Sequence, residues 1–169
     1  MSVQPIATAD LSDAAGGGIA LDPRIRPMWH GACVQGPAFT VQTPAGQHPA
    51  VKQALEAAAP GDVIVIDGAG STERALWGDR MSARAQERGI AGVVIFGACR
   101  DVSLIEALAF PVFAITSVPT APLTELDGQT GVAIACAGRT VAQGDLVVGD
   151  ADGVVVVPKL DIERVLASL

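Results

Sequence analysis

The chain has 169 residues, half of them hydrophobic, and a formal net charge of −7, which favours a single domain over residues 1–169 with a buried core. The acidic balance argues against direct nucleic-acid binding, because an acidic surface repels phosphate, although it would suit docking onto a basic protein segment. Near the centre, the longest stretch without a charged or strongly polar residue, 89–99, has about half of the ~20 residues that a membrane helix needs. We therefore expect a cytoplasmic homo-oligomer whose surplus apolar residues lie in buried strands and between subunits.

The first two thirds of the chain alternate helical patterns with short apolar strands. The capping-type residues Thr8 and Asp10 predict the start of a first helix, and three glycines at 16–18 predict its end. Pro49 suits the first position of a second helix. The expected helices cover 8–15, 49–59, a short segment ending at 89, and the segment after 101 through 108. The expected strands cover 38–43, 63–66, 91–96 and 112–116.

The last third of the chain is predicted to be mostly strands. Residues 117–130 hold two prolines and little periodicity, so they are predicted to form a loop. Strands are expected at 131–136, 140–142, 146–148 and 154–157, with a hairpin turn over 149–153 and a final helix over 161–169. The order of these elements predicts an α/β fold with a mixed sheet or barrel-like core flanked by helices.

Several polar motifs are better explained as structure than as sites. The loop Gly68–Ala69–Gly70 follows a strand, but it lacks the further glycine of a dinucleotide fingerprint and the lysine of a P-loop. We interpret it as a tight turn, which also weakens a methyltransferase assignment. The pair Asp150 and Asp152 resembles only the start of a calcium loop, so a turn is again the better interpretation.

The histidines and cysteines form no metal-binding pattern. His30 and His48 share no ligand spacing with each other or with a cysteine, so we expect them at the surface or in loops. The three cysteines are far apart and lack a Cys-x-x-Cys spacing. Cys33, Cys99 and Cys136 are therefore interpreted as reduced core thiols.

The stretch from Gly78 to Asp101 carries the strongest functional signal. It contains a Gly-Asp-Arg-Met sequence at 78–81, a short helix, a strand that is apolar on both faces, and the pair Arg100–Asp101 where that strand stops. Charges at the end of a buried strand are costly unless they are paired, hydrated or bound to a metal. Arg100 and Asp101 are therefore either a structural ion pair or the floor of an active site.

The same stretch resembles a known family. The pattern of Gly78–Asp79, twenty residues, and then Arg100–Asp101 is similar to that of the regulator of ribonuclease activity A (RraA-like) family, which includes metal-dependent 4-hydroxy-4-methyl-2-oxoglutarate aldolases. The resemblance also includes 10–14, 60–67 and 144–158, so it covers most of the chain. It implies a swivelling β/β/α domain that assembles as a homotrimer or a hexamer.

The resemblance also implies roles for the site residues. Asp101 would bind a divalent metal cation, Mg²⁺ or Mn²⁺, because one carboxylate with several waters suits a hard ion. Arg100 would stabilise an enolate oxygen as its negative charge develops, and Asp79 would hold metal-bound water. The loop Gly78–Asp79–Arg80–Met81 would offer backbone N–H groups to the carboxylate of a small 2-oxo acid substrate.

The implied activity is that of an aldolase and oxaloacetate decarboxylase. It would release pyruvate from 4-hydroxy-4-methyl-2-oxoglutarate or oxaloacetate through a metal-stabilised enolate. One position departs from the family pattern: active aldolases usually carry an acid three residues after the Arg-Asp aspartate, where this chain has Leu104. Glu163 is a candidate donor of that acid from a neighbouring subunit. The alternative is a non-catalytic regulator that binds ribonuclease E or a similar protein, which the acidic surface and Leu104 both favour.

Overall fold

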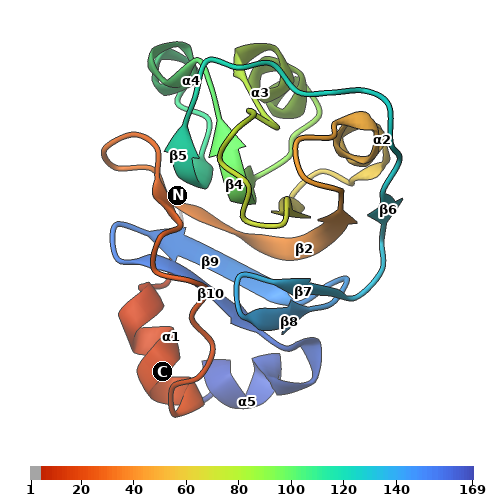
Figure 1. The fold of residues 1–169 in the computed structure, drawn as a ribbon. Coiled ribbons are helices and arrows are strands. Elements are labelled where there is room, and N and C mark those ends of the chain that lie inside the picture. Colours follow the sequence, from red (N-terminus) through yellow and green to blue (C-terminus); the bar gives the residue numbers. More distant parts are fainter. Residues whose placement is uncertain (1–4) are drawn as a thin grey trace.

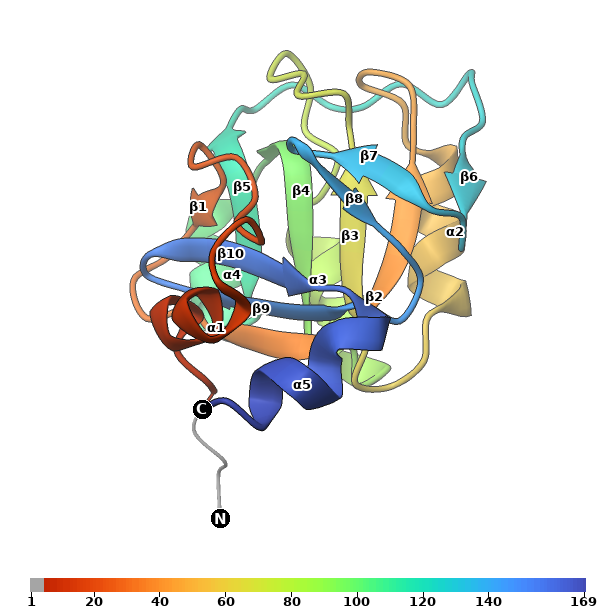
Figure 2. The same cartoon turned by 90° about the horizontal axis from the view of Figure 1, so that it is seen from below.

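The computed structural model describes residues 5–169 and contains a strongly curved mixed β-sheet with helices around it (Figure 1, Figure 2). The strands are β1 (Arg26–Pro27), β2 (Val34–Gln42), β3 (Val63–Asp67), β4 (Gly92–Cys99), β5 (Val112–Ser117), β6 (Gln129–Thr130), β7 (Ile134–Cys136), β8 (Arg139–Val141), β9 (Leu146–Asp150) and β10 (Gly153–Val157). The helices are α1 (Thr8–Ala15), α2 (Pro49–Ala57), α3 (Asp79–Glu87), α4 (Val102–Leu108) and α5 (Ile162–Leu166), with a 3-10 turn, η1, at Lys159–Asp161.

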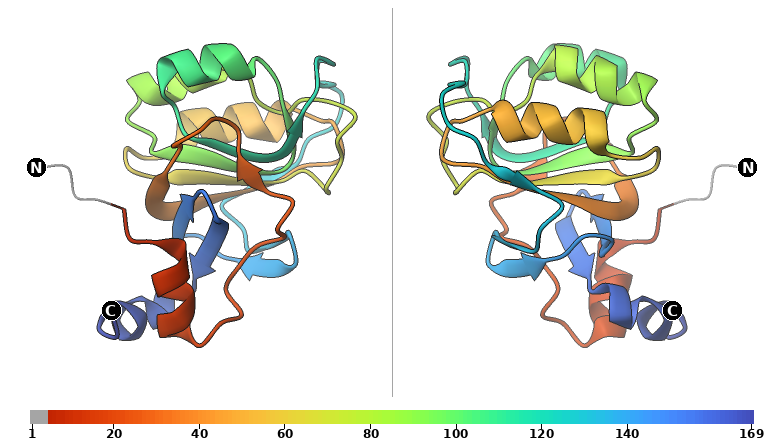
Figure 3. Two further views of the ribbon diagram at one scale, coloured as in Figure 1. Left: turned by 90° about the vertical axis from the view of Figure 1, so that its left-hand side faces the viewer. Right: turned by 90° about the vertical axis from the view of Figure 1, so that its right-hand side faces the viewer.

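Strands β2 to β5 form the parallel centre of the sheet. They lie in the order β5-β4-β3-β2, and each is joined to the next by one of the helices α2, α3 and α4. These helices lie together on one face of the sheet (Figure 3). Because all the connections run the same way, the segments that follow the carboxyl ends of these strands are gathered at one edge of the sheet, where α/β proteins commonly bind ligands.

The two ends of the sheet curve toward each other. Strands β9 and β10 continue the sheet beyond β2, and β1 pairs with β5 at the other end. The guanidinium group of Arg26 in β1 donates hydrogen bonds to the backbone carbonyls of Ala151 and Asp152 between β9 and β10, both at 3.0 Å. The sheet is therefore nearly closed, and Ile134 and Cys136 of the β7–β8 hairpin pack into its interior.

The two groups of helices occupy different ends of the molecule. Helices α2, α3 and α4 cover the parallel strands, whereas α1 and α5 pack together beneath β9 and β10 (Figure 1). Thr8 attaches α1 to the β9–β10 hairpin, because its backbone N–H and its Oγ1 donate to the carboxylate of Asp150 at 2.9 and 2.8 Å. Thr8 therefore does not cap α1 with its side chain, which corrects that prediction.

The predicted elements of the first two thirds are confirmed, with corrections to strand length. β2 begins at Val34 instead of residue 38, since Val34–Pro37 pair with β9; the Gly-Pro sequence there hides the strand pattern. β4 continues to Cys99 instead of ending at 96, through small residues that lack β-propensity. The two-residue strand β1 has no periodicity that could predict it.

The last third needs larger corrections. The predicted loop over 117–130 ends in β6, which pairs with β2. The strand predicted from residue 131 begins at Ile134, because Gly131 has a φ of 72°. The hairpin turn is confirmed but contains only Ala151 and Asp152, and the final helix is confined to α5 after η1. Every helix in residues 5–169 is too short or too polar for a membrane span.

The cysteine prediction is correct for two thiols and wrong for one. Cys99 and Cys136 are free and buried, whereas Cys33 is free and exposed. Burial raises the pKa of the Cys99 thiol to about 12, so this thiol stays protonated at neutral pH. Burial raises the pKa of Cys136 as well. Cys99 and Cys136 therefore serve as packing residues of the core.

Candidate active site

A cleft of about 650 Å³ lies at the carboxyl-terminal edge of the parallel strands, a size typical of small-molecule sites. Segments that follow all four of these strands line it: His48 and Lys52 after β2, residues 75–81 after β3, Arg100, Asp101 and Leu104 after β4, and Pro122 and Thr124 after β5. Every site residue predicted from the sequence, from Gly78 to Met81 and at 100–101, lines this one cleft. The topology thus brings together residues that are twenty or more positions apart.

The pair at the end of β4 combines a weak ion pair with a strained backbone. Nε of Arg100 lies 3.6 Å from Oδ2 of Asp101, and the two side chains are 40% and 35% exposed. Such a half-exposed pair stabilises a fold by about 0–1 kcal/mol. Asp101 also has a left-handed backbone, with φ 61° and ψ 37°, and its side chain does not cap α4. A non-glycine residue held this way costs about 1 kcal/mol or more, so stability alone does not account for the pair.

Gly78 lies directly against this pair. A Cβ atom on residue 78 would lie 2.8 Å from Oδ2 of Asp101 and 3.5 Å from Cγ of Arg100. The approach is fixed by a hydrogen bond from the backbone N–H of Arg100 to the carbonyl of Trp77, at 2.9 Å. The backbone of Gly78 is extended, with φ −152°, so space and not conformation requires glycine here.

The first turn of α3 presents backbone donors to the cleft. The first hydrogen bond of the helix runs from the N–H of Ser82 to the carbonyl of Gly78, at 3.0 Å. The N–H groups of residues 79–81 therefore have no partner within the helix, and they lie at its positive end. Oγ of Ser82 accepts from Nε1 of Trp77 at 2.8 Å and donates to the carbonyl of Gly78 at 3.0 Å, which fixes this turn.

His48 also lines the cleft. The sequence predicts a surface or loop position, and His48 does lie in the loop between β2 and α2. It is only 8% exposed, however, and its Nε2 lies 2.9 Å from Sδ of Met81. Burial, followed by the positive charges of Lys52 and Arg100, lowers the pKa of His48 to about 4, so its imidazole is neutral at neutral pH. One sequence feature could have indicated that His48 lies in the cleft: it stands immediately before Pro49, at the start of the helix that follows β2.

Positive charge predominates in the cleft. Its charged side chains are Lys52, Arg80 and Arg100 against Asp79 and Asp101, in a chain whose net charge is −7. Within residues 5–169, neither Lys52 nor Arg80 forms an ion pair with a carboxylate. A local positive excess on an acidic molecule attracts anions, so the cleft suits an anionic small molecule.

The carboxylates of the cleft fit a hydrated divalent cation. Across residues 5–169, no three His, Cys, Asp or Glu side chains gather closely enough to enclose a metal ion. An ion in the cleft would therefore depend on the Asp101 carboxylate, whose Oδ2 occupies the space that Gly78 leaves open, and on water. A hard ion such as Mg²⁺ or Mn²⁺ accepts one carboxylate and several waters, whereas Zn²⁺ sites generally use three or four protein ligands.

The remaining sequence motifs have structural roles. Gly68–Ala69–Gly70 is a tight turn, as predicted: a Cβ on Gly68 would lie 2.6 Å from the Leu76 side chain, and Gly70 has a φ of 68° and lies against the Phe96 ring. This loop therefore packs against the protein itself. Asp150 is part of the predicted turn, where its carboxylate accepts from Thr8.

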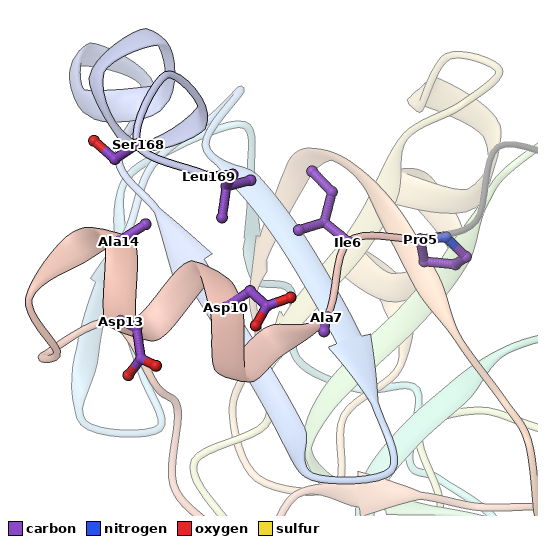
Figure 4. Close-up of a pocket in the computed structure, with 8 residues that line it drawn as sticks. All are labelled: Pro5, Ile6, Ala7, Asp10, Asp13, Ala14, Ser168 and Leu169. Atoms are coloured by element: carbon purple, nitrogen blue, oxygen red, sulfur yellow. The ribbon is translucent and has the colours of Figure 1, made fainter.

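A second hollow, of about 860 Å³, lies between α1 and the last residues of the chain (Figure 4). Its charged side chains are Asp10 and Asp13, whose carboxylates point in different directions in Figure 4. It is larger than the cleft but offers no cation to an anionic ligand. Glu163 of α5 also lies at this end of the molecule, so it does not reach the cleft of its own chain (Figure 1).

Comparison with known proteins relates this fold and cleft to one family. The family model described as "RraA-like: Aldolase/RraA" matches residues 8–156. A protein of Halalkalibacterium halodurans named "Putative 4-hydroxy-4-methyl-2-oxoglutarate aldolase" is 44% identical over 161 residues, which are 95% of this chain and 77% of that protein.

Two solved structures share the fold under different names. The RNA-processing inhibitor RraA from "Thermus thermophilis" is 31% identical, with a TM-score of 0.82 over 90% of this chain and 93% of that one. An "S-adenosylmethionine: 2-dimethylmenaquinone methyltransferase" from Geobacillus kaustophilus HTA426 is 37% identical, with a TM-score of 0.84 over 91% and 96%. These relatives share one fold but are named for three different functions. The fold alone therefore does not identify the function, and the side chains of the cleft have to be considered.

Proposed function

The chain belongs to the RraA-like family, and from this membership we propose that it is a divalent-metal aldolase and decarboxylase that releases pyruvate from 2-oxo diacids. The observation that carries the proposal is the convergence of Arg100, Asp101 and the first turn of α3 on one cleft at the ends of the parallel strands. This set suits an anionic substrate on which negative charge develops. The tight packing of the Gly68–Gly70 turn offers no support for an adenosine-binding methyltransferase.

The 2-oxo acid end of the substrate would bind between α3 and β4. The free N–H groups of residues 79–81 would donate to its carboxylate, as helix N-termini do with anions. The guanidinium of Arg100 would donate to the 2-oxo oxygen and stabilise the negative charge that develops there. A planar group with several fixed donors suits this task better than an ammonium group does.

Asp101 would hold the divalent cation, and Asp79 would accept a hydrogen bond from a water in its shell. When bound, the cation supplies Lewis-acid polarisation of the 2-oxo group. Because Gly78 has no Cβ, Oδ2 of Asp101 can occupy this position beside the backbone.

The same bond breaks in both reactions. In retro-aldol cleavage of 4-hydroxy-4-methyl-2-oxoglutarate, the C4 hydroxyl gives its proton to a water molecule, and the C3–C4 electron pair moves toward C3 and the 2-oxo oxygen. C4 becomes the carbonyl carbon of one pyruvate, and C3 takes a proton from water to give the other. In decarboxylation of oxaloacetate, the C3–C4 pair follows the same path while CO₂ leaves, so no hydroxyl base is needed. In both cases Arg100 would stabilise the oxygen that gains charge.

The test is pyruvate release from each substrate, with and without Mg²⁺. We expect pyruvate release that depends on both protein and metal. In Asp101→Asn, added Mg²⁺ should no longer stimulate release by the protein. Because Mg²⁺ alone decarboxylates oxaloacetate slowly, the reference is the same solution without protein. Release no faster than this reference, from both substrates, would contradict the proposal.

A second candidate function is regulation of a ribonuclease E-type partner. Two observations favour it: the similarity to the RraA structure, and an acidic chain whose Leu104 is 55% exposed at the edge of the cleft. A fluorescence titration of labelled protein with purified ribonuclease E tests this role. Binding without any pyruvate release would favour the regulator over the enzyme.

A further inference from the structure

The cleft has a second cationic wall that the reaction described above does not use. We propose that Lys52, held beside His48 on the first turns of α2, binds the distal carboxylate of the substrate and makes the cleft selective for 2-oxo diacids over 2-oxo monoacids. This inference rests on the proposed function, because it assumes that the 2-oxo acid end lies at Arg100 and α3.

The position of Lys52 follows from the geometry of α2. Lys52 lies one helical turn after His48, and its backbone N–H donates to the carbonyl of His48 at 3.1 Å. Residues four apart share a helix face, which explains why both side chains line the cleft. The backbone N–H of His48 in turn donates to the carbonyl of Leu123 at 2.9 Å, so the loop after β5 fixes the start of the helix.

The charge of Lys52 has no partner in the protein. Lys52 is one of two lysines in the chain, the other being Lys159, and within residues 5–169 no carboxylate lies within ion-pair distance of it. Its charge nevertheless acts inside the cleft, because Lys52 and Arg100 both contribute to the low pKa of the buried His48. Since His48 is neutral, Lys52 is the cation on the α2 side.

Cationic side chains on two separate walls of the cleft, Arg80 and Arg100 on one and Lys52 on the other, match a ligand with two carboxylates. Arg100 and residues 79–81 account for the 2-oxo acid end, which leaves Lys52 for an anion further along the ligand. A 2-oxo monoacid would place an uncharged end at this wall. The volume of about 650 Å³ is ample for a diacid with a five-carbon main chain.

This assignment predicts different effects on the two reactions. The distal carboxylate of 4-hydroxy-4-methyl-2-oxoglutarate keeps its charge throughout the reaction. Lys52 therefore stabilises the bound substrate and the transition state equally. The distal carboxylate of oxaloacetate becomes neutral CO₂, so Lys52 stabilises the bound substrate more than the transition state. Loss of Lys52 should raise KM for both diacids but should not lower kcat for decarboxylation.

The experiment measures binding of two uncleavable probes by calorimetry in millimolar Mg²⁺. One probe is 2-oxoglutarate, which lacks the 4-hydroxyl group, and the other is 2-oxopentanoate, the monoacid of the same chain length. We expect the wild-type protein to bind the diacid about tenfold more tightly, as one charged contact near the surface allows. Lys52→Met should abolish this preference, Lys52→Arg should restore most of it, and the control Lys159→Met should keep it.

The outcomes separate the two proposals. A preference for the diacid that survives in Lys52→Met would overturn the role of Lys52, even if the protein releases pyruvate. Equal weakening of both probes by Lys52→Met would overturn it too, since Lys52 would then serve the 2-oxo acid end. A preference that depends on Lys52, without pyruvate release from any substrate, would leave this inference standing and refute the aldolase.

Discussion

At the scale of single residues, Arg100 and Gly78 show how the site combines chemistry with space. If Arg100 serves only in an ion pair, another positive side chain can replace it. If it contacts the reacting oxygen, its planar guanidinium group is required. We expect Arg100→Lys to lower kcat for pyruvate release by about 100-fold, as the loss of a transition-state donor does, while the melting temperature stays close to that of the wild type. Steady-state kinetics and thermal unfolding, with Arg164→Lys of α5 as the control, measure both. Unchanged kcat would refute the catalytic role.

Gly78→Ala tests the space that the site needs. The added Cβ would lie 2.8 Å from Oδ2 of Asp101, so the carboxylate must move. Alanine tolerates the extended backbone at this position, with φ −152°, so the fold should survive. We expect turnover to fall at least about tenfold, because small displacements of reacting groups are costly. A circular dichroism spectrum like that of the wild type, together with full activity, would show that the space beside Asp101 serves no catalytic purpose.

His48 should make stability depend on pH. The pKa of the folded state is about 4, below the ordinary value of 6.5, so the unfolded chain binds the proton more readily. The contribution of the neutral imidazole is complete above pH 6.5 and is lost as the pH falls toward 4, by up to roughly 3 kcal/mol. Denaturant unfolding of the wild type and His48→Gln at pH 7.5, 5.5 and 4.5 isolates this effect, because the carboxylates titrate in both proteins. Parallel pH profiles would contradict it.

At the scale of elements, α4 determines what position 104 can do. Asp101 precedes α4 as its N-cap, and the backbone N–H of Leu104 donates to the carbonyl of Asp101 at 3.0 Å. Leu104 therefore lies one turn along and lines the cleft, as the helical spacing predicts, whereas Glu106 does not. An acid at 104 would face the same space as the Asp101 carboxylate.

We therefore expect Leu104→Glu to tighten Mg²⁺ or Mn²⁺ binding by about 10–100-fold, the usual effect of a residue that supports a metal ligand. Aldol cleavage should gain more than decarboxylation. The measurements are calorimetric titration with Mn²⁺ and the Mg²⁺ dependence of pyruvate release. Ala107→Glu adds the same charge on α4 away from the cleft and serves as the control. Equal metal affinity in all three proteins would mean that the ligand set is completed elsewhere, for example by Glu163 of a neighbouring subunit.

The elements that the sequence predicts correctly are those that depend on local signals, namely apolar periodicity and the prolines and glycines at helix ends. The apolar runs of β3 and β4, the proline that opens α2 and the glycine after α3 are local signals, and the structure confirms them. The first half of β2 and the strand β6 exist because of partners far along the chain, β9 and β2, so no local pattern reveals them. The burial of His48 is hidden from the sequence for the same reason, because it depends on the loop after β5 and on Met81.

At the scale of the whole molecule, half of the residues are apolar although no helix in residues 5–169 can span a membrane. Large apolar side chains remain exposed, including Leu126 at 55% and Leu160 at 97%. We therefore expect a homo-oligomer of the 17.1 kDa chain at micromolar concentration. The family resemblance implies that it is a homotrimer or a hexamer. Size-exclusion chromatography with light scattering measures the mass. A monomer across this range would refute the subunit interface and, with it, any acid donated by a neighbour.

The order of the strands in the sheet also has a consequence during synthesis on the ribosome. Strands β2 to β5 emerge in the order in which they pair, but the outer edge of Val34–Pro37 in β2 is matched only when Leu146–Gly149 arrives, more than a hundred residues later. Until then, the nascent chain exposes an unpaired strand edge, which is a site for aggregation. A pause once β5 has emerged from the ribosome would therefore hold a chain whose cleft is nearly complete while its sheet is still open, and this is the stage at which a chaperone would be most needed.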